Sequence, residues 1–453
     1  GVGTIATLNV TGNATIDGNA NIGGVLTYED VTSVDSVGVV TARGLSIFGN
    51  TTGLNVASGI STFQAVTGTT GTFSADGSFN SVSIGKGASS NTGNTVVGET
   101  ALDAVTTGTN NTAVGYQAAT DLTTGSENNV FGSLALANTT TGSKNNAFGK
   151  QALEDNTTGA NNTAFGHDVL RENTTANNNT GVGYQALYNN TTAAENTAVG
   201  ASSLYNNTTG TPNTAIGYNS LTSNTTGGSN TACGKSALQN STTADHNTAV
   251  GNNCLLSNTT GASNTAVGSL ALDANTTASN NTAVGRSALS AVTTATQCTA
   301  VGSLAADASD AGNICAFGYG ALTDNTTGAD NNAFGTASLA NNTTATRNNA
   351  FGTSAMQTNT IGAYNCAFGY AALFANTTAS YNSAFGHLAL QANTTGTNLA
   401  AIGAFALDAN TTGNNNTAVG YNALSSETTG SNATGIGFAA GLNNTTGTIT
   451  ALG

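Results

Sequence analysis

Of the 453 residues only 7% are charged, and 8 Lys and Arg stand against 22 Asp and Glu, which gives a formal net charge of −14 at pH 7. Such a shortage of basic side chains argues against nucleic-acid binding, which depends on Lys and Arg to displace counterions from phosphates, and equally against an anionic membrane surface. No run approaches about 18 apolar residues, so we expect no membrane insertion. The chain is nevertheless 38% hydrophobic, which is too apolar for a disordered polar tract.

Residues 1–80 are predicted to form a β-rich stalk or shaft. Short β-type runs alternate there with Gly and Asn turns, as in residues 7–12, 14–18 and 20–24, and no long period relates them. Residues 81–85, with the sequence Ser-Val-Ser-Ile-Gly, have the form of a junction coil. We therefore expect the second domain, residues 81–453, to begin at this point.

A tandem repeat with a period of 17 dominates the rest of the chain. Its marker glycine recurs in 21 copies from Gly98 to Gly437, and its residue number rises by 17 at every step except from Gly302 to Gly318, where it rises by 16. The consensus is N-T-A-V-G-Y-x-A-L-x-x-N-T-T-G-x-N. Such a fixed period is typical of a solenoid in which each repeat forms one coil.

Two columns of the repeat are predicted to form the core. The residue before the marker glycine is apolar in every copy, and Leu stands four residues after the glycine in 17 copies. The marker glycine itself is predicted to make a turn. The predicted core residues are Val114, Phe131, Phe148, Val182, Leu136, Leu153, Leu187 and Leu424, and the predicted turn glycines are Gly115, Gly132, Gly149, Gly166 and Gly183.

The pattern favours strands over helices. The apolar residues form one short cluster followed by about ten polar, Gly-rich residues, whereas an amphipathic helix needs apolar residues at intervals of three and four over several turns. We expect an all-β, parallel β-solenoid of 21 coils, each with two short strands, stacked about 4.8 Å apart. One coil buries too little apolar surface to offset the ordering of its residues, so stacking and a partner chain are expected to contribute.

Candidate chemical sites are few. His167 and His387 are 13 coils apart and cannot share a metal ion within one chain, although three copies of one His could meet on the axis of a trimer. The glycines around Gly183 resemble a dinucleotide-binding loop only superficially, because they lie inside the repeat. The acidic residues are scattered over the columns, which argues against a calcium ladder, and adjacent Thr residues favour an ice-binding array only weakly. We expect no catalytic, cofactor or metal site, and no enzyme.

The cysteines do not form a zinc motif, because no C-x-x-C pair exists. Cys298 and Cys315 are one full period apart and could stack in neighbouring coils near disulfide distance. Small core or ladder residues are the favoured interpretation of all five, namely Cys233, Cys254, Cys298, Cys315 and Cys366. At Asp310, beside the shortened step to Gly318, we expect a local bulge or kink.

The phrases Ser-Val-Ser-Ile-Gly at 81–85 and Asn-Thr-Ala-Val-Gly at 111–115 resemble the head repeats of YadA-type trimeric autotransporter adhesins. The longer phrase that ends in Asn-Thr-Thr-Gly is similar to repeats of bacteriophage tail-fibre-like proteins. The resemblance implies a parallel β-roll in a homotrimer. The period of 17 departs from the adhesin head, so the cross-section of the coil is expected to differ.

The resemblance and the repeat together predict a structural fibre protein. We expect a phage tail fibre or spike shaft on the virion surface that projects a receptor-binding end, with itself, other virion or fibre proteins, and a host surface receptor or glycan as partners. A bacterial cell-surface adhesin or an extracellular filament is the alternative. The shaft is expected to be chemically inert, because its coils repeat one small set of residues and substitutions are scattered singly.

Overall fold

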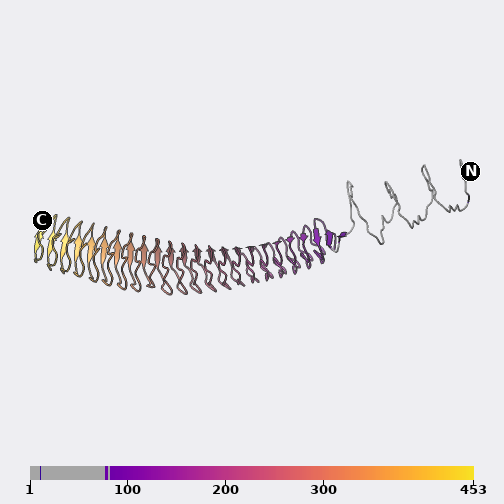
Figure 1. Ribbon diagram of the computed structural model, residues 1–453, viewed down its shortest axis with the longest axis horizontal. Helices are drawn as coiled ribbons and strands as arrows, with labels where there is room; N and C mark the ends of the chain where they lie inside the picture. The colour runs from indigo at the N-terminus through magenta and orange to yellow at the C-terminus, as the bar shows by residue number, and fades with distance from the viewer. Residues whose placement is uncertain (1–10, 12–76, 80–81) are drawn as a thin grey trace, which may run out of the picture. The chain divides into compact units, whose positions relative to one another are not determined.

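The computed structural model describes residues 11, 77–79 and 82–453. The chain divides into two units, residues 1–71 and 72–453, and the description below concerns the second unit. The predicted stalk lies almost wholly outside the described residues. Figure 1 shows the coils of residues 82–453 stacked side by side, with the strands of successive coils aligned. The described part of the chain contains no helix, and hence none long and apolar enough to cross a membrane.

All the described strands belong to one sheet. The first three, β1 (Gly77–Phe79), β2 (Val82–Gly85) and β3 (Thr95–Gly98), pair antiparallel, so the expected junction coil at 81–85 is an antiparallel strand instead. From β3 onward every pairing is parallel. The parallel strands are β4 (Thr112–Val114), β5 (Asn129–Phe131), β6 (Asn146–Phe148), β7 (Thr163–Phe165), β8 (Thr180–Val182), β9 (Thr197–Val199), β10 (Asn213–Ile216), β11 (Asn230–Cys233), β12 (Thr248–Val250), β13 (Thr265–Val267), β14 (Thr282–Val284), β15 (Thr299–Val301), β16 (Cys315–Phe317), β17 (Asn332–Phe334), β18 (Asn349–Phe351), β19 (Cys366–Phe368), β20 (Ser383–Phe385), β21 (Ala400–Ile402), β22 (Thr417–Val419), β23 (Thr434–Ile436) and β24 (Thr450–Leu452).

Each coil contributes one strand, and not the two that the sequence predicts. We number the residues of a coil 1 to 17 from the first Asn of the consensus, so that the strand covers positions 2 to 4 and the marker glycine is position 5. The remainder is turns, because positions 7, 9 and 17 have positive φ: 57° at Gln151, 55° at Leu153 and 58° at Asn161. L-residues seldom adopt this conformation. Backbone hydrogen bonds to the adjacent coils hold it, for example from Leu153 N–H to Val169 O at 3.0 Å.

The core of the coil contains small residues at positions 3 and 8 and the Leu of position 9. The predicted core residues Leu136, Leu153, Leu187 and Leu424 are fully buried, as expected. The prediction is wrong for the other column: Phe131 is 40% exposed, and Val114, Phe148 and Val182 are half-buried. Side chains alternate between the two faces of a strand. The Ala of position 3 points inward, so its neighbour at position 4 must point outward.

Two ladders of buried Asn residues close the turns. At position 1, the backbone N–H of Asn145 donates to Asn128 Oδ1 at 2.9 Å in the preceding coil, and Asn145 Nδ2 donates to Gly159 O at 2.9 Å in its own coil. At position 12, Asn173 Nδ2 donates to Asn156 Oδ1 at 2.7 Å in the preceding coil. Since a buried amide without partners is costly, these ladders fix both the turn and the stacking register.

The five predicted turn glycines all have positive φ, between 127° and 149°. At Gly166, φ is 137° and an added Cβ would lie 2.5 Å from Gly183 O in the next coil. A side chain therefore has neither a favourable backbone conformation nor space at this position. The prediction that the marker glycine is required by a turn is confirmed.

The shortened step between Gly302 and Gly318 leaves the sheet intact, and no bulge interrupts the strands. Cys315 pairs with Thr299 and Phe317 with Val301, in the same register as in every other coil. The missing residue comes out of the turn at positions 13 and 14, where Asp310 replaces the Thr pair. Its Oδ1 accepts the backbone N–H groups of Thr293, Thr294 and Ala295 at 3.0–3.2 Å. One carboxylate thus takes over the hydrogen bonding of the shortened turn.

Asp310 should make the stability of this coil depend on pH. Burial raises its pKa, but the hydrogen bonds from the Thr293 hydroxyl and three backbone N–H groups outweigh burial and leave the pKa below the ordinary value of an Asp carboxyl. Stability from the ionised form is therefore present above that value and is lost as the pH falls through the folded pKa. We expect the free energy of unfolding of Asp310→Asn to be lower than that of wild type at pH 6 by about 0.5–1 kcal/mol, since the exposed carboxylate is screened by solvent. Denaturant unfolding would measure this difference, which should shrink on acidification.

Asp307 in the same coil provides a control of opposite sign. Burial and the nearby Asp324 carboxylate raise the pKa of Asp307, so its ionisation opposes folding as the pH rises. Asp307→Asn should therefore gain stability relative to wild type between acidic and neutral pH. Parallel pH profiles for the two variants would contradict this assignment.

Candidate functional site

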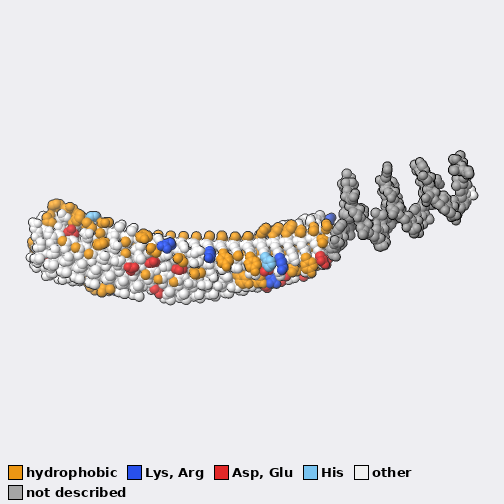
Figure 2. All heavy atoms as spheres, in the orientation of Figure 1, with side chains coloured by type: hydrophobic (Ala, Val, Ile, Leu, Met, Phe, Trp, Pro, Cys, Tyr) orange, Lys and Arg blue, Asp and Glu red, His pale blue; other side chains and the backbone are white. Residues whose placement is uncertain are grey.

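One outer face of the sheet, formed by positions 2 and 4 of each coil, is free of charge along its whole length. Position 4 is always Val, Phe, Ile, Leu or Cys, and none of these side chains is fully buried. Position 2 is mostly Thr or Asn. Figure 2 shows a row of hydrophobic side chains along the edge of the coils where Figure 1 draws the strands. We call positions 2 and 4 together the outer strand face.

Stacked phenylalanines reinforce this face in two blocks. Phe131, Phe148 and Phe165 stack with ring centroids 4.9 and 5.0 Å apart. A longer block of five rings runs from Phe317 to Phe385, with centroids 4.4–5.1 Å apart. The rings follow the coil spacing because strand pairing places identical positions beside one another. Their outward surfaces remain exposed and apolar.

A second feature is a cluster of unlike side chains over four consecutive coils, between positions 6 and 10. Arg171 Nε contacts Glu154 Oε2 at 2.7 Å, and Arg171 Nη1 donates to the Tyr188 hydroxyl at 2.5 Å. The rings of Tyr188 and Tyr205 stack with centroids 5.1 Å apart. The Glu154 carboxylate raises the pKa of the Arg171 guanidinium through this hydrogen bond. These four residues occupy position 10 of successive coils.

Positions 6 and 7 extend the cluster. His167 Nδ1 lies 2.9 Å from Asp168 Oδ2, and the His167 ring lies 5.8 Å from that of Tyr184. Gln185 Nε2 donates to the same Asp168 oxygen at 3.4 Å. Gln151, at position 7 of the first coil of the cluster, donates from Nε2 to Glu154 Oε2 at 2.9 Å and so links positions 7 and 10 of that coil. We call the whole set the lateral cluster: Gln151, Glu154, His167, Asp168, Arg171, Tyr184, Gln185, Tyr188 and Tyr205.

The lateral cluster contradicts the expectation that substitutions are scattered singly. Figure 2 shows charged, His and hydrophobic side chains gathered over coils in the N-terminal half of the solenoid. The sequence carried a signal for it, because Glu154, Arg171, Tyr188 and Tyr205 follow one another at intervals of one period. A comparison of each column along the chain, and not only its consensus, would have found the cluster.

Two other aromatic groups lie further along the solenoid. At position 17, Arg347 contacts Asp330 at 3.6 Å and donates to the Tyr364 hydroxyl, and Tyr364 stacks on Tyr381 at 5.1 Å. Near the last coils a row of rings follows positions 6 and 7. Its members are Tyr370, His387, Phe405, Tyr421 and Phe438, with centroids 5.3–5.9 Å apart.

The histidines and cysteines that the sequence singled out lie apart from one another. His167 and His387 occupy position 6 in distant coils, and no group of three or more His, Cys, Asp or Glu within the described ranges could hold a metal ion. The five cysteines are free thiols. The stacking of Cys298 on Cys315, which the spacing left open, does not occur, because the shortened step places Cys315 opposite Thr299. Burial raises the pKa of Cys254 to about 12 and that of Cys298 to about 11, so both are unreactive core residues.

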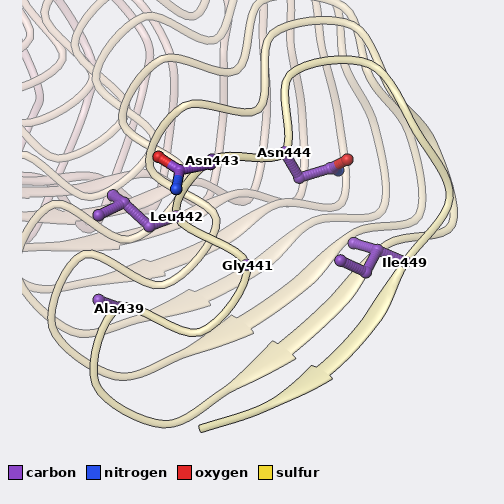
Figure 3. Close-up of a pocket in the computed structure, with 6 residues that line it drawn as sticks. All are labelled: Ala439, Gly441, Leu442, Asn443, Asn444 and Ile449. Atoms are coloured by element: carbon purple, nitrogen blue, oxygen red, sulfur yellow. The ribbon is translucent and has the colours of Figure 1, made fainter.

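A hollow of about 590 Å³ lies in the last coil, lined by Ala439, Gly441, Leu442, Asn443, Asn444 and Ile449 (Figure 3). Gly441 stands at position 9, where most coils carry the buried Leu, and a Cβ added there would lie 2.7 Å from Leu424 Cδ2. The lining has no titratable side chain. Its chemistry therefore offers no acid, base or nucleophile.

Comparisons of the chain with models of protein families, with curated proteins and with solved structures give no match.

Proposed function

We propose that the chain is a structural fibre protein, the shaft of a phage tail fibre or spike that projects a host-receptor-binding end and assembles as a homotrimer. The observation that carries this proposal is the outer strand face. It runs without a charged side chain from β3 to β24, in a chain whose formal net charge is −14. At about 4.8 Å per coil, this stack is about 100 Å long.

The area of the outer strand face suits self-association. Phe165 is 55% exposed and Ile402 48%, and the other large side chains of position 4 are exposed to a similar or smaller extent, apart from Leu452 in the last strand, which is 77% exposed. With roughly 150–200 Å² per large side chain, the column leaves about 1,000 Å² of apolar surface uncovered. Monomeric proteins rarely expose a continuous apolar patch of that size. A standard interface buries about 800 Å² on each partner, so a second copy of the same face could cover it.

The proposal of three copies and of a phage rests on the resemblance of the repeat phrases to YadA-type adhesin heads and phage tail-fibre repeats.

A copy of this chain is a suitable partner because two charge-free faces meet without repulsion between the acidic chains. In the described coils, the charged residues occupy positions 6, 7, 10 to 13, 16 and 17 and thus lie away from the outer strand face.

A pair of substitutions tests the assembly. We expect the wild type to sediment at three times 44.3 kDa. Phe334→Lys with Phe368→Lys should reduce it to monomers, because six ammonium groups of a trimer would be buried against apolar rings. The matched control is Thr344→Lys with Thr378→Lys, which adds the same charge at two exposed Thr residues of position 14. A wild type that sediments as a single chain would refute the assembly.

Electron microscopy tests the role. An antibody raised against the solenoid should label the tail fibres of phage particles. If the antibody labelled filaments on bacterial cells and not phage particles, the phage assignment would be overturned. A cell-surface adhesin or extracellular filament would then be favoured.

A further inference from the structure

The lateral cluster is not needed by the fold. Position 10 carries Ala in Ala137 and Ala340, position 6 carries Ser in Ser133 and Ser269, and position 7 carries Ser in Ser236. These coils have the same strand, turns and register as the coils of the cluster. Coils that lack these side chains thus fold in the same way, so folding does not explain the side chains of the cluster.

The polar groups of the cluster are held in fixed positions by one another. Glu154 accepts from both Gln151 and Arg171, and Arg171 also donates to Tyr188. Such mutual contacts limit the rotamers of long side chains and reduce the entropy lost on binding. The cluster is a preorganised surface of donors and acceptors.

Asp168 has acceptor capacity that the chain does not use. Its Oδ2 contacts His167 and Gln185, whereas its Oδ1 is buried and accepts no hydrogen bond. The residue as a whole is only 8% exposed. A buried acceptor without a donor is unfavourable, and a donor group of a ligand can relieve it once the neighbouring side chains move to expose this oxygen.

Exposed aromatic surface lies directly beside these polar groups. Tyr184 is 53% exposed and sits against His167, and the stacked pair Tyr188 and Tyr205 borders Arg171. Aromatic faces bind the apolar C–H faces of a ligand, while their hydroxyls and the neighbouring carboxylates bind its polar edge. Burial and the nearby Tyr188 raise the pKa of Tyr205, so its hydroxyl remains a donor at neutral pH.

The charge balance selects the class of ligand. Three carboxylates, those of Glu154, Asp168 and Glu172, outnumber two basic side chains: Arg171, whose guanidinium is already paired, and the exposed Lys150 beside His167. An anionic ligand would meet carboxylates, whereas an uncharged ligand with many hydroxyls could donate to carboxylates, accept from Arg171 and His167, and stack on tyrosine rings. We propose that the lateral cluster is a binding site for a neutral oligosaccharide on the side of the solenoid. This inference does not depend on the role as a fibre shaft.

The test uses the full chain in its assembled form and an array of oligosaccharides of glucose, galactose, mannose and N-acetylglucosamine, together with heparin and sialylated glycans. We expect at least one neutral oligosaccharide to bind. Tyr184→Ser with Tyr188→Ala should weaken that binding about tenfold or more, the value expected for the loss of two ring contacts. Both substitutions place residues that other coils carry at the same positions, so the fold should persist, which protection from proteolysis would verify.

The matched control is Tyr319→Ser. Tyr319 occupies position 6 like Tyr184 and is 60% exposed, but Gly320 and Thr323 stand at positions 7 and 10 of its coil. This variant should bind within about twofold of wild type. The inference would be overturned if no neutral oligosaccharide bound, or if only the anionic glycans bound. It would also be overturned if Tyr319→Ser lost as much binding affinity as the double variant.

Discussion

Gly166→Ala should open the solenoid locally at its coil. The added Cβ would lie 2.5 Å from Gly183 O and 2.9 Å from Gly183 C, and both atoms belong to the backbone of the next coil. Neither atom can move without breaking the hydrogen bond from Gly183 N–H to Phe165 O. Strain from φ of 137° adds to the clash. We expect a loss of at least about 3 kcal/mol, measured as faster amide hydrogen exchange in peptides that cover residues 150–200.

Gly320→Ala is the matched control, because Gly320 also has positive φ, 61°, but faces open space apart from Thr323 Oγ1 at 3.1 Å. Other coils already carry Ala at this position, in Ala337 and Ala371, with φ of 54° and 50°. This substitution should destabilise its coil by only about 1–2 kcal/mol, because Ala is strained at positive φ but meets no backbone atom of the next coil. Equal effects at Gly166 and Gly320 would show that positive φ alone, and not the approach of the next coil, requires the marker glycine.

The period of the repeat predicted the architecture, because coils of equal length place equal residues in register. The Leu column of position 9 was predicted correctly for the same reason. The prediction that Phe131 lies in the core was wrong, because it equated an apolar residue with a buried one. Of two neighbouring residues in a strand, only one can point inward. The sequence does not distinguish an apolar column in the core from an apolar column on the outer strand face.

The turns could not be predicted from the consensus. Leu153 has φ of 55°, although nothing in its chemistry favours that conformation, and the bond from its N–H to Val169 O holds it there. This preference comes from the neighbouring coil and not from local sequence. The expectation of two strands per coil was wrong because these turns replace the second strand.

The lateral cluster shows a different limit. Its members were visible in the sequence, but the consensus averages each column and conceals residues that share a column over only a few coils. The spacing of Arg171 and Tyr188 by one period places them in contact, and the structure adds the link through Gln151 that joins positions 7 and 10.

The buried Asn ladder of position 12 should respond differently at its interior and at its end. Asn173 lies in the interior: its Nδ2 donates to Asn156 Oδ1 at 2.7 Å and its Oδ1 accepts from Asn190 Nδ2 at 3.1 Å. Asn173→Val would leave Asn156 Oδ1 without a donor and remove one bond from Asn190. Asn275 lies at an end, because Val292 follows it in the column and its own Oδ1 already has no partner.

The same substitution at the end of the ladder should therefore destabilise its coil much less. Asn275→Val removes one unsatisfied oxygen and creates another at Asn258, whose Oδ1 accepts from Asn275 at 2.7 Å. We expect Asn173→Val to destabilise its coil by about 2 kcal/mol more than Asn275→Val, the penalty for an additional buried group without a partner. Hydrogen exchange of the amides in each coil would measure the difference. Equal destabilisation would mean that each Asn acts through the bond to its own turn, to Ala176 O or Ala278 O, and that the ladder between coils contributes little.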